Sequence, residues 1–413
     1  MAMQYFPRQL LYLLLVSLML VACSKEEVQE EGLEQEPIIV VAGESIVINA
    51  MPGEQFVEEE RQLLIGVVGP ETGAEANFGM AVVQGAKLAV QQLNEAGGIS
   101  GQDLRLLHYD NQSDADKTMG IVQYLIDQRA MAIITAPTGW ATFGPTHLSD
   151  ESNTILISVG SRRRIARSGD YIFQLSLSDE VATDYMIGYS VHEMGFKRFA
   201  LVTVSDYDYS LDISALFKKA ATRKGAEIGL EVDTYDTFTG QHNVQQTIAE
   251  IVGEAKSLDA VIFTGGISEA ASLVRGLSER QVKLPLLAGE DLFSDEFLQL
   301  AGPAAAGSLV YATYPNRKLP QTAEFISAFQ RENASVPDRF AALAYDATTL
   351  VADTMIETGS RHSSVVRKVM LGSKMMNGVT GASEFSNQGA SIKVPLIYKV
   401  IKSEGSEKFA LQL

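Results

Sequence analysis

The sequence predicts an α/β protein of two lobes, each built on a parallel sheet flanked by helices. From Gln62 onward, short β-prone apolar runs alternate with helical patterns, which is typical of βαβ units. This alternation restarts after a junction near residues 177–178. The chain has 413 residues, more than one hydrophobic core usually serves, so its length agrees with two lobes.

The elements of the first half follow from their apolar spacing. The clearest helix is expected at 78–95, where Val83, Leu88 and Leu93 recur on one face before Gly97-Gly98 ends it. In chain order, strands are expected at 63–68, 104–109, 130–135 and 154–158, and a second helix at 113–128.

The second half repeats the pattern and then crosses back. Strands are expected at 199–204, 227–235, 260–264 and 284–288, and helices at 210–224, 244–256 and 269–280. A further chain crossing is expected near 308–313, followed by helices at 322–333, 340–358 and 363–370 and a β-rich end at 383–413. Several crossings between two similar halves predict a hinge of more than one strand.

The N-terminus has the pattern of a bacterial lipoprotein signal peptide at residues 1–22. Arg8 precedes an apolar stretch that is too short to span a bilayer, which needs about 20 apolar residues. Leu20-Val-Ala-Cys23 resembles a lipobox, and Cys23 is the only cysteine of the chain. An ordinary signal peptide is the alternative. We expect a mature chain that begins at lipidated Cys23, outside the cytoplasm, and is attached to the membrane only through that anchor.

Residues 23–61 are expected to form an acidic tether. Residues 24–60 hold eleven Glu and one Lys, which is more than half of the net charge of −18. Two β-prone runs, 38–41 and 45–48, interrupt this segment around Gly43 and predict either an added edge strand or a short hairpin. So acidic a chain is a poor candidate for binding nucleic acid.

Signatures of enzymes and metal sites are missing from the sequence. It holds no phosphate-binding P-loop, no HExxH and no GxSxG motif, and its five histidines are scattered. Asp206–Asp212 has the alternating oxygens of a calcium loop but lacks its glycine and its final glutamate, which is Phe217 here. We therefore expect no catalysis, no metal and no cofactor.

Ligand-binding residues should instead collect in the loops after the strands, because the crevice of an open α/β sheet lies beyond the carboxyl ends of its strands. In the first half these loops are 69–80, 135–142 and 158–162. In the second half they are 205–210, 264–268 and 288–291. The first of them leads into a helix whose N-terminal amides favour an anion.

Over about residues 62–405 the chain resembles the type I periplasmic binding proteins of the leucine/isoleucine/valine-binding class. The resemblance is carried, in order, by Gly69-Pro70-x-x-Gly73 with Phe78-Gly79, Asn94-Glu-Ala-Gly-Gly-Ile99-x-Gly101, Tyr109-Asp110, Ile155–Ser158, Tyr345-Asp346-Ala347 and Phe385…Gly389. It implies two Rossmann-like lobes joined by a three-crossing hinge. The first lobe is expected at 62–178 plus 313–380, and the second at 179–312 plus 381–413.

The resemblance also implies individual ligand contacts. Glu290 falls where the family binds the ammonium of its ligand, although a carboxylate after a strand could also simply cap a helix. Tyr209 aligns with a tyrosine that covers the ligand, with Tyr207 close enough to confuse the register, and Phe78 is expected as an apolar wall.

Three positions depart from the family pattern. Gly139 replaces a hydroxyl residue, Arg162 replaces a threonine that helps to hold the carboxylate, and Ile267 replaces a frequent aromatic. Arg162 could hold a carboxylate bidentately, or residues 162–164 could form a solvated loop. The remaining candidates from the same loops are Thr138, Trp140, Thr142, Gly160 and Ser161.

These observations predict an extracytoplasmic solute-binding lipoprotein, periplasm-facing if the cell is Gram-negative. As a monomer, it would capture a small amino-acid-like or amide ligand by hinge closure and deliver it to an ABC permease with its ATPase. The alternatives are a ligand-binding sensor, or a structural or regulatory lipoprotein of the cell envelope on the same fold.

Overall fold

The computed structural model describes residues 38–41, 44–47, 63–73, 75–137, 139–160, 164–372, 374–375, 377–403 and 405–412. The chain divides into two compact units, Met1–Glu54 and Gln55–Leu413. In the first unit, β1 (Ile38–Val41) and β2 (Glu44–Val47) pair antiparallel, with Ile38 opposite Val47, as expected for the hairpin alternative. The expected signal peptide, with Cys23, lies outside the described residues.

The first sheet of the second unit is parallel throughout, with the strand order β4-β3-β5-β6-β7. Its strands are β3 (Leu63–Gly69), β4 (Leu104–Asp110), β5 (Ala132–Thr135), β6 (Ile155–Ser158) and β7 (Ile172–Gln174). All residues of β3 are buried, as expected for a parallel strand covered on both faces.

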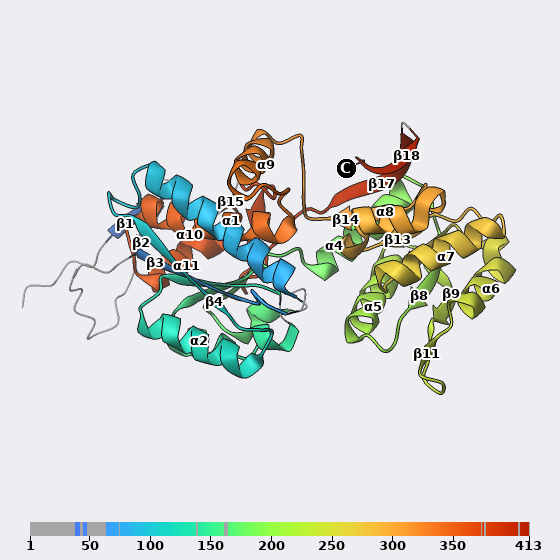
Figure 1. Ribbon diagram of the computed structural model, residues 1–413, viewed down its shortest axis with the longest axis horizontal. Helices are drawn as coiled ribbons and strands as arrows, with labels where there is room; N and C mark the ends of the chain where they lie inside the picture. The colour runs from blue at the N-terminus through green and yellow to red at the C-terminus, as the bar shows by residue number, and fades with distance from the viewer. Residues whose placement is uncertain are drawn as a thin grey trace, which may run out of the picture. The chain divides into compact units, whose positions relative to one another are not determined.

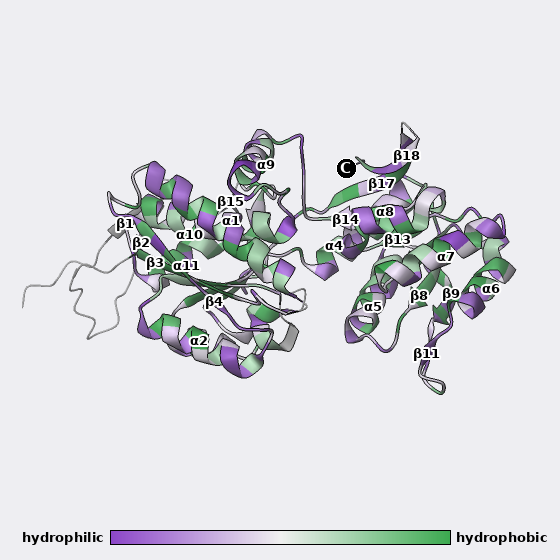
Figure 2. Ribbon diagram, viewed as in Figure 1, coloured by the Kyte–Doolittle hydropathy of each residue, from purple (hydrophilic) through white to green (hydrophobic). Residues whose placement is uncertain are grey.

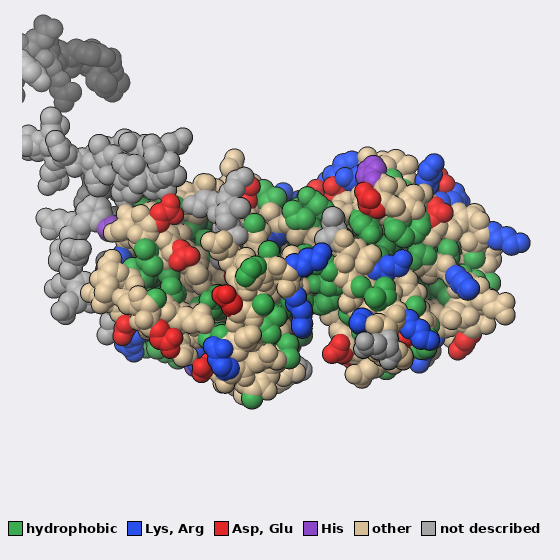
Figure 3. All heavy atoms as spheres, turned by 90° about the horizontal axis from the view of Figure 1, so that it is seen from above, with side chains coloured by type: hydrophobic (Ala, Val, Ile, Leu, Met, Phe, Trp, Pro, Cys, Tyr) green, Lys and Arg blue, Asp and Glu red, His purple; other side chains and the backbone are tan. Residues whose placement is uncertain are grey.

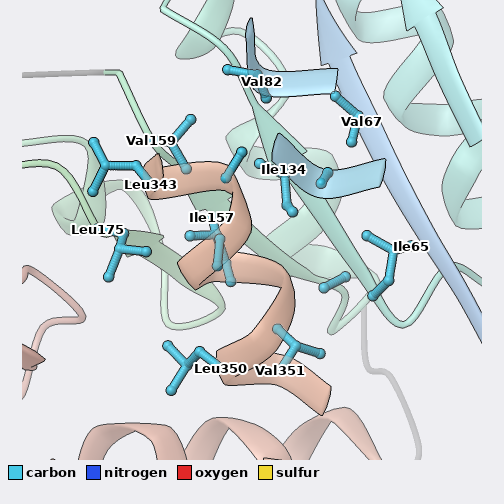
Figure 4. Packing of buried hydrophobic residues seen from close by; sticks show 14 of the residues in the cluster. Ile65, Val67, Val82, Ile134, Ile157, Val159, Leu175, Leu343, Leu350 and Val351 are labelled. Atoms are coloured by element: carbon cyan, nitrogen blue, oxygen red, sulfur yellow. The ribbon is translucent and has the colours of Figure 1, made fainter. Parts of the chain in front are cut away.

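Helices cover both faces of this sheet (Figure 1). On one face, α1 (Ala76–Glu95) and α10 (Arg339–Thr358) pack over Ile65, Val67 and Ile134 (Figure 4). On the other face, α2 (Ala115–Asp127) packs over alternate residues of the same strands. The lobe is completed by α3 (Thr146–Glu151), α9 (Pro320–Asn333) and α11 (Ser363–Gly372).

Capping side chains fix where two of these helices begin. Asp114 accepts a hydrogen bond from the amide of Lys117 at 2.8 Å at the start of α2. Asp338 accepts bonds of 2.9 Å from the amides of Phe340 and Ala341 at the start of α10. Such caps satisfy amides that have no partner within the helix, so the position of Arg339, the first residue of α10, is well defined.

The second sheet has the strand order β18-β17-β14-β13-β12-β8-β9, in which β17 runs antiparallel to both of its neighbours, β14 and β18, and all other neighbouring strands are parallel. Its strands are β8 (Arg198–Thr203), β9 (Glu227–Asp233), β12 (Ala260–Phe263), β13 (Leu286–Ala288), β14 (Leu309–Ala312), β17 (Leu396–Ser403) and β18 (Ser406–Leu411). Strands of both sheets are largely hydrophobic, whereas their helices carry hydrophilic residues on their outer sides (Figure 2).

Five helices cover the second sheet, and they separate into two groups. One face packs against α4 (Asp179–His192) and α5 (Asp208–Arg223). The other packs against α6 (Val244–Glu254), α7 (Ile267–Glu279) and α8 (Asp295–Ala301). Shorter strands are β10 (Tyr235–Asp236) paired with β11 (Gln241–His242), and β15 (Lys374–Met375) paired with β16 (Ser383–Glu384).

The third crossing of the chain lies later than the sequence predicted. Phe385 belongs to the core of the first lobe, where its ring centroid lies 5.2 Å from that of Phe173. The backbone amide of Gln174 donates to the carbonyl of Gly389 at 2.9 Å, and the backbone carbonyl of Gln174 accepts a bond from the amide of Ser391 at 2.8 Å. The segment up to residue 391 therefore lies with the first sheet, and the expected lobe boundary at 380 is wrong.

A buried polar network holds the chain just before this crossing. Asp346 of α10 accepts bonds from the amides of Val379 at 2.7 Å and Thr380 at 3.0 Å. Buried Lys393 donates to the hydroxyls of Thr380, at 2.6 Å, and Ser383. Burial lowers the pKa of Lys393 to about 8, against the raising effect of Asp346. The network ties the entry into β17 to the core helix of the first lobe.

Several elements were not anticipated from the sequence. The longest is α4, whose buried face includes Thr183 and Ser190 beside Met186 and Ile187, so its apolar stripe is weak. The others are short: β7, α3 and α8. Among the described residues, no helix combines the length and the apolar character that crossing a bilayer requires.

Candidate ligand-binding site

Glu290 lies at the carboxyl end of β13, where it begins a short 3-10 helix, Glu290–Leu292. The side chain is buried, with 7% of its surface exposed. Its Oε2 atom accepts hydrogen bonds from the amide of Thr313 at 3.0 Å and from the hydroxyl of Thr313 at 2.8 Å. Because Thr313 follows β14, the carboxylate has partners outside its own turn and is held at the second crossing of the chain.

Arg339 also reaches this place, although the sequence did not point to it. Its Nη2 atom donates to Oδ1 of Asp291 at 2.9 Å, and Nη1 donates to the carbonyl of Glu290 at 3.3 Å. Its Nε atom lies 3.7 Å from Oε1 of Glu290. Arg339 comes from α10 of the first lobe, whereas both carboxylates belong to the second, so the site joins the two lobes.

Aromatic rings continue the site into the first lobe. The guanidinium of Arg339 lies 4.5 Å from the ring centroid of Phe340, a cation–π distance. The ring of Phe340 in turn lies 5.1 Å from that of Phe78, in the first turns of α1. Phe78 is 41% exposed, so one expected apolar wall lies beside the charged cluster and remains accessible to a ligand.

Two tyrosines of the second lobe lie where β8 leads into α5: Tyr207 at the N-terminal cap of the helix and Tyr209 in its first turn. Tyr209 donates its hydroxyl to Oδ1 of Asp179 at 2.8 Å, which ties the start of α5 to the start of α4. Tyr207 is 50% exposed, and the two rings lie 5.8 Å apart. Tyr207 therefore presents more of its side chain to solvent than Tyr209, which is half-buried.

Other expected site residues have packing roles that the structure defines. Ile267 begins α7 and packs, half-buried, against the core of the second sheet. Thr142 is buried and donates its hydroxyl to the carbonyl of Ala136 at 3.3 Å. At Gly160 an added Cβ would lie 2.3 Å from Cβ of Pro137, so a side chain there would clash with the neighbouring loop.

The carboxylate end of the expected site falls largely outside what the structure describes. Thr138, Ser161 and Arg162 are not among the described residues, and only the backbone of Gly139 and Trp140 is, within the 3-10 helix Gly139–Thr142. The last residue of the arginine run, Arg164, pairs with Glu180 at 3.3 Å, and both side chains are exposed. That contact is typical of a solvated loop.

Elsewhere in the described part of the chain we examined cavities, possible metal ligands and surface charge for a second candidate site. A cavity of about 740 Å³ in the first lobe is lined by residues of α9 and α10, including Phe325, Tyr345 and Asp353, and contains none of the expected site residues. Within the described ranges, no group of three or more His, Cys, Asp or Glu side chains could hold a metal ion. On the face shown in Figure 3, basic and acidic side chains are interspersed without a continuous basic patch.

Comparison with known proteins gives matches that include strands of both sheets. A family model described as periplasmic binding protein matches residues 62–399. An amino acid binding protein of Pseudomonas aeruginosa is 24% identical over 337 residues, which cover 79% of this chain and 87% of that protein.

Two solved structures have the same fold. An ABC transporter substrate-binding protein from Sphaerobacter thermophilus has a TM-score of 0.72 at 18% identity, covering 85% of this chain and 96% of that one. A branched-chain amino acid transporter substrate binding protein from Streptococcus pneumoniae, in complex with isoleucine, has a TM-score of 0.67 at 23% identity, covering 85% and 100%. Both structures are described as substrate-binding proteins of transporters, the class that the sequence resembles.

Proposed function

This chain belongs to the periplasmic binding protein family, and we propose that it captures a small amino-acid-like ligand between its lobes and delivers it to an ABC permease. The observation that carries the proposal is the placement of Glu290. It is a buried carboxylate at the carboxyl end of β13, which pairs parallel with both neighbouring strands, and it lies within 4 Å of a residue from the other lobe. In open α/β sheets that edge is where ligands bind.

The mechanism is hinge closure. A ligand whose ammonium contacts Glu290 and whose apolar part packs on Phe78 touches both lobes at once. Such a ligand favours the closed state by the contacts it makes only there. The apolar walls are completed by Tyr209, Trp140 and Ile267. The first-lobe loops line the ligand pocket through Thr138, Gly139, Thr142, Gly160 and Ser161. Arg162 binds the ligand's carboxylate, because a guanidinium matches its two oxygens.

Delivery and attachment complete the proposal. The partners are an ABC permease and its ATPase, which read the closed state of a monomeric binding protein. The protein works outside the cytoplasm, held to the membrane by a lipid on Cys23 and an acidic tether at residues 23–61. A sensor or a structural envelope lipoprotein remains the alternative, and a kinase, cyclase or cell-wall synthase gene beside this one would favour it over transport.

The ligand proposal is tested first on the purified protein. A thermal-shift screen of amino acids, their amides and short carboxylates identifies binders, because a ligand of the native state raises the melting temperature. Calorimetry then compares the parent with Glu290→Gln, which keeps the shape of the side chain and an oxygen that can accept the bonds from Thr313. Loss of a buried charge partner typically costs about 2–5 kcal/mol, so an amino acid should bind more than about tenfold more weakly.

The matched control is Glu231→Gln, which removes a carboxylate of the same lobe that pairs with Lys218 at the surface. This variant should bind like the parent. Equal affinity of Glu290→Gln and the parent for an amino acid would show that the ligand amine is not bound at Glu290. No binding of any amino acid, amide or carboxylate by the parent would favour the structural alternative.

A further inference from the structure

A β-hairpin at residues 235–242 carries the most exposed large hydrophobic side chain of the described residues. β10 pairs antiparallel with β11, with Tyr235 opposite His242, and Phe238 lies at the tip between the two strands. Phe238 is 97% exposed, and in Figure 1 the hairpin, labelled β11, extends away from the second sheet. Leaving so much apolar surface in water is unfavourable, so a surface that covers this ring gains free energy.

Hydrogen bonds order the tip, so Phe238 is not carried by a loose loop. Oδ1 of Asp236 accepts bonds from the amides of Phe238 at 2.8 Å and Thr239 at 3.3 Å. The carbonyl of Asp236 accepts a bond from the amide of Gly240 at 2.8 Å, and Gly240 has a φ of 65°, which favours glycine. An aromatic residue whose backbone is already fixed loses less conformational freedom when it binds a partner.

The base of the hairpin is bound to the segment that follows β8. Oδ1 of Asp233 accepts a bond from the amide of Ser205 at 3.1 Å, and Nε2 of His242 lies 3.2 Å from Oδ2 of Asp206. That segment continues into the start of α5, where the candidate site residue Tyr209 lies. The hairpin is therefore anchored to a segment of the candidate ligand-binding site, although none of its own residues is a proposed ligand contact.

The hairpin and the segment to which it is bound are acidic. Residues 204–216 and 233–247 contain no lysine or arginine but five aspartates, which we call the acidic patch: Asp206, Asp208, Asp212, Asp233 and Asp236. The next cation along α5, Lys218, pairs with Glu231 of β9 at 2.5 Å. The exposed ring of Phe238 is thus presented next to a concentration of negative charge.

We propose that the hairpin 235–242 is a docking element of the second lobe for a partner protein, which offers an apolar pocket for Phe238 edged by Lys or Arg side chains. Cations at the edge of that pocket complement the acidic patch, whereas the patch repels an anionic lipid surface. The inference rests on the proposed function, in which this partner is the permease. It adds the surface through which the permease is contacted.

The first test separates ligand binding from delivery. Phe238→Ser is introduced into the chromosomal gene of the cell that produces this protein, and uptake of labelled L-leucine, L-isoleucine, L-valine and L-phenylalanine is compared with that of the parent and of a gene deletion. Gene-dependent uptake should fall at least about fivefold, because a central aromatic anchor contributes much of the energy of an interface. Calorimetry on the full-length protein should give the parent's affinity, because Phe238 is no ligand contact.

The matched control for Phe238→Ser is Val336→Ser. Val336 is 63% exposed and lies just before α10 in the first lobe, so its loss should leave both uptake and affinity unchanged. Asp212→Lys tests the acidic patch, since it reverses one charge in α5 without altering the hairpin. Repulsion from the cations of the partner should lower uptake at least about threefold, again at unchanged affinity.

Three results would overturn the docking proposal. Uptake by Phe238→Ser equal to that of the Val336→Ser control would show that the hairpin is not used in delivery, although delivery itself stands. Weaker calorimetric binding by Phe238→Ser would make Phe238 part of the ligand site. For Phe238→Trp, a blue shift of fluorescence with vesicles of phosphatidylethanolamine and phosphatidylglycerol, not shown by the parent with its single Trp140, would assign the hairpin to the membrane. A parent that binds amino acids but supports no uptake refutes both delivery and docking.

Discussion

The packing of α1 against α10 makes a sharp prediction about Gly85. A Cβ atom at this position would lie 2.0 Å from the carbonyl oxygen of Ala341 and 2.7 Å from its carbonyl carbon. Contacts of this kind ordinarily begin at 3.4 Å, so the helices would have to separate by about 1.4 Å. Ala341 lies two residues after Arg339, and the displacement would therefore reach the candidate ligand site.

The expected magnitude follows from two opposing effects. Adding a methyl group to a well-packed interface typically costs about 1–3 kcal/mol, and the backbone carbonyl that it meets cannot rotate away as a side chain could. Replacing glycine by alanine inside a helix stabilises the folded state by about 1 kcal/mol, because alanine has the higher helix propensity. We therefore expect Gly85→Ala to lower the free energy of unfolding by up to about 2 kcal/mol.

Urea unfolding followed by circular dichroism measures this difference. The matched control is Gly120→Ala within α2, because an added Cβ there meets no atom within 4 Å. Only the effect of helix propensity remains, so the free energy of unfolding of this variant should rise by up to about 1 kcal/mol. If Gly85→Ala were as stable as Gly120→Ala, the close approach of α1 and α10 would not exist in solution, and the reasoning would be refuted.

Two further predictions concern Lys393 and Cys23. Burial lowers the pKa of Lys393 to about 8, below the ordinary lysine value of 10.5. The unfolded chain therefore binds more protons than the folded one between these two pH values, so the free energy of unfolding rises with pH there. From about pH 7 to about pH 9.5 the parent should gain about 2 kcal/mol relative to Lys393→Met in urea unfolding; parallel pH profiles would contradict the buried ammonium. Cys23→Ser should release or mis-process the protein in membrane fractionation, and membrane retention of the variant with its signal cleaved would refute the anchor.

Much of the fold was predictable because parallel sheets leave a strong local pattern. A central strand such as β3 is covered on both faces and reads as a continuous apolar run, and α1 shows one apolar stripe. The helix α4 was missed because hydroxyl residues share its buried face. The lobe boundary near 380 was wrong because contacts such as Phe385 with Phe173 join residues more than two hundred positions apart.

The candidate site likewise contains one residue that the sequence could predict and one that it could not. Glu290 could be found from its place after a strand and from the family resemblance, since both are properties of a short segment. Arg339 could not, because nothing near residue 339 indicates that α10 begins beside the end of β13. The pair Asp338-Arg339 does carry one signal, a helix cap followed by a cation, but its significance depends on the carboxylates of the other lobe.

The site and the hinge depend on the same contacts. Thr313 follows β14 at the second crossing and also holds Glu290, while Tyr209 bonds Asp179 close to the first crossing. The apparent affinity for a ligand that binds the closed state is the intrinsic affinity of that state multiplied by the fraction of molecules that adopt it. A substitution at Thr313 or Tyr209 therefore changes both factors, whereas Glu290→Gln keeps a hydrogen-bond acceptor for Thr313 and changes mainly the contact. For this reason Glu290 is the more informative position at which to test the ligand's charge.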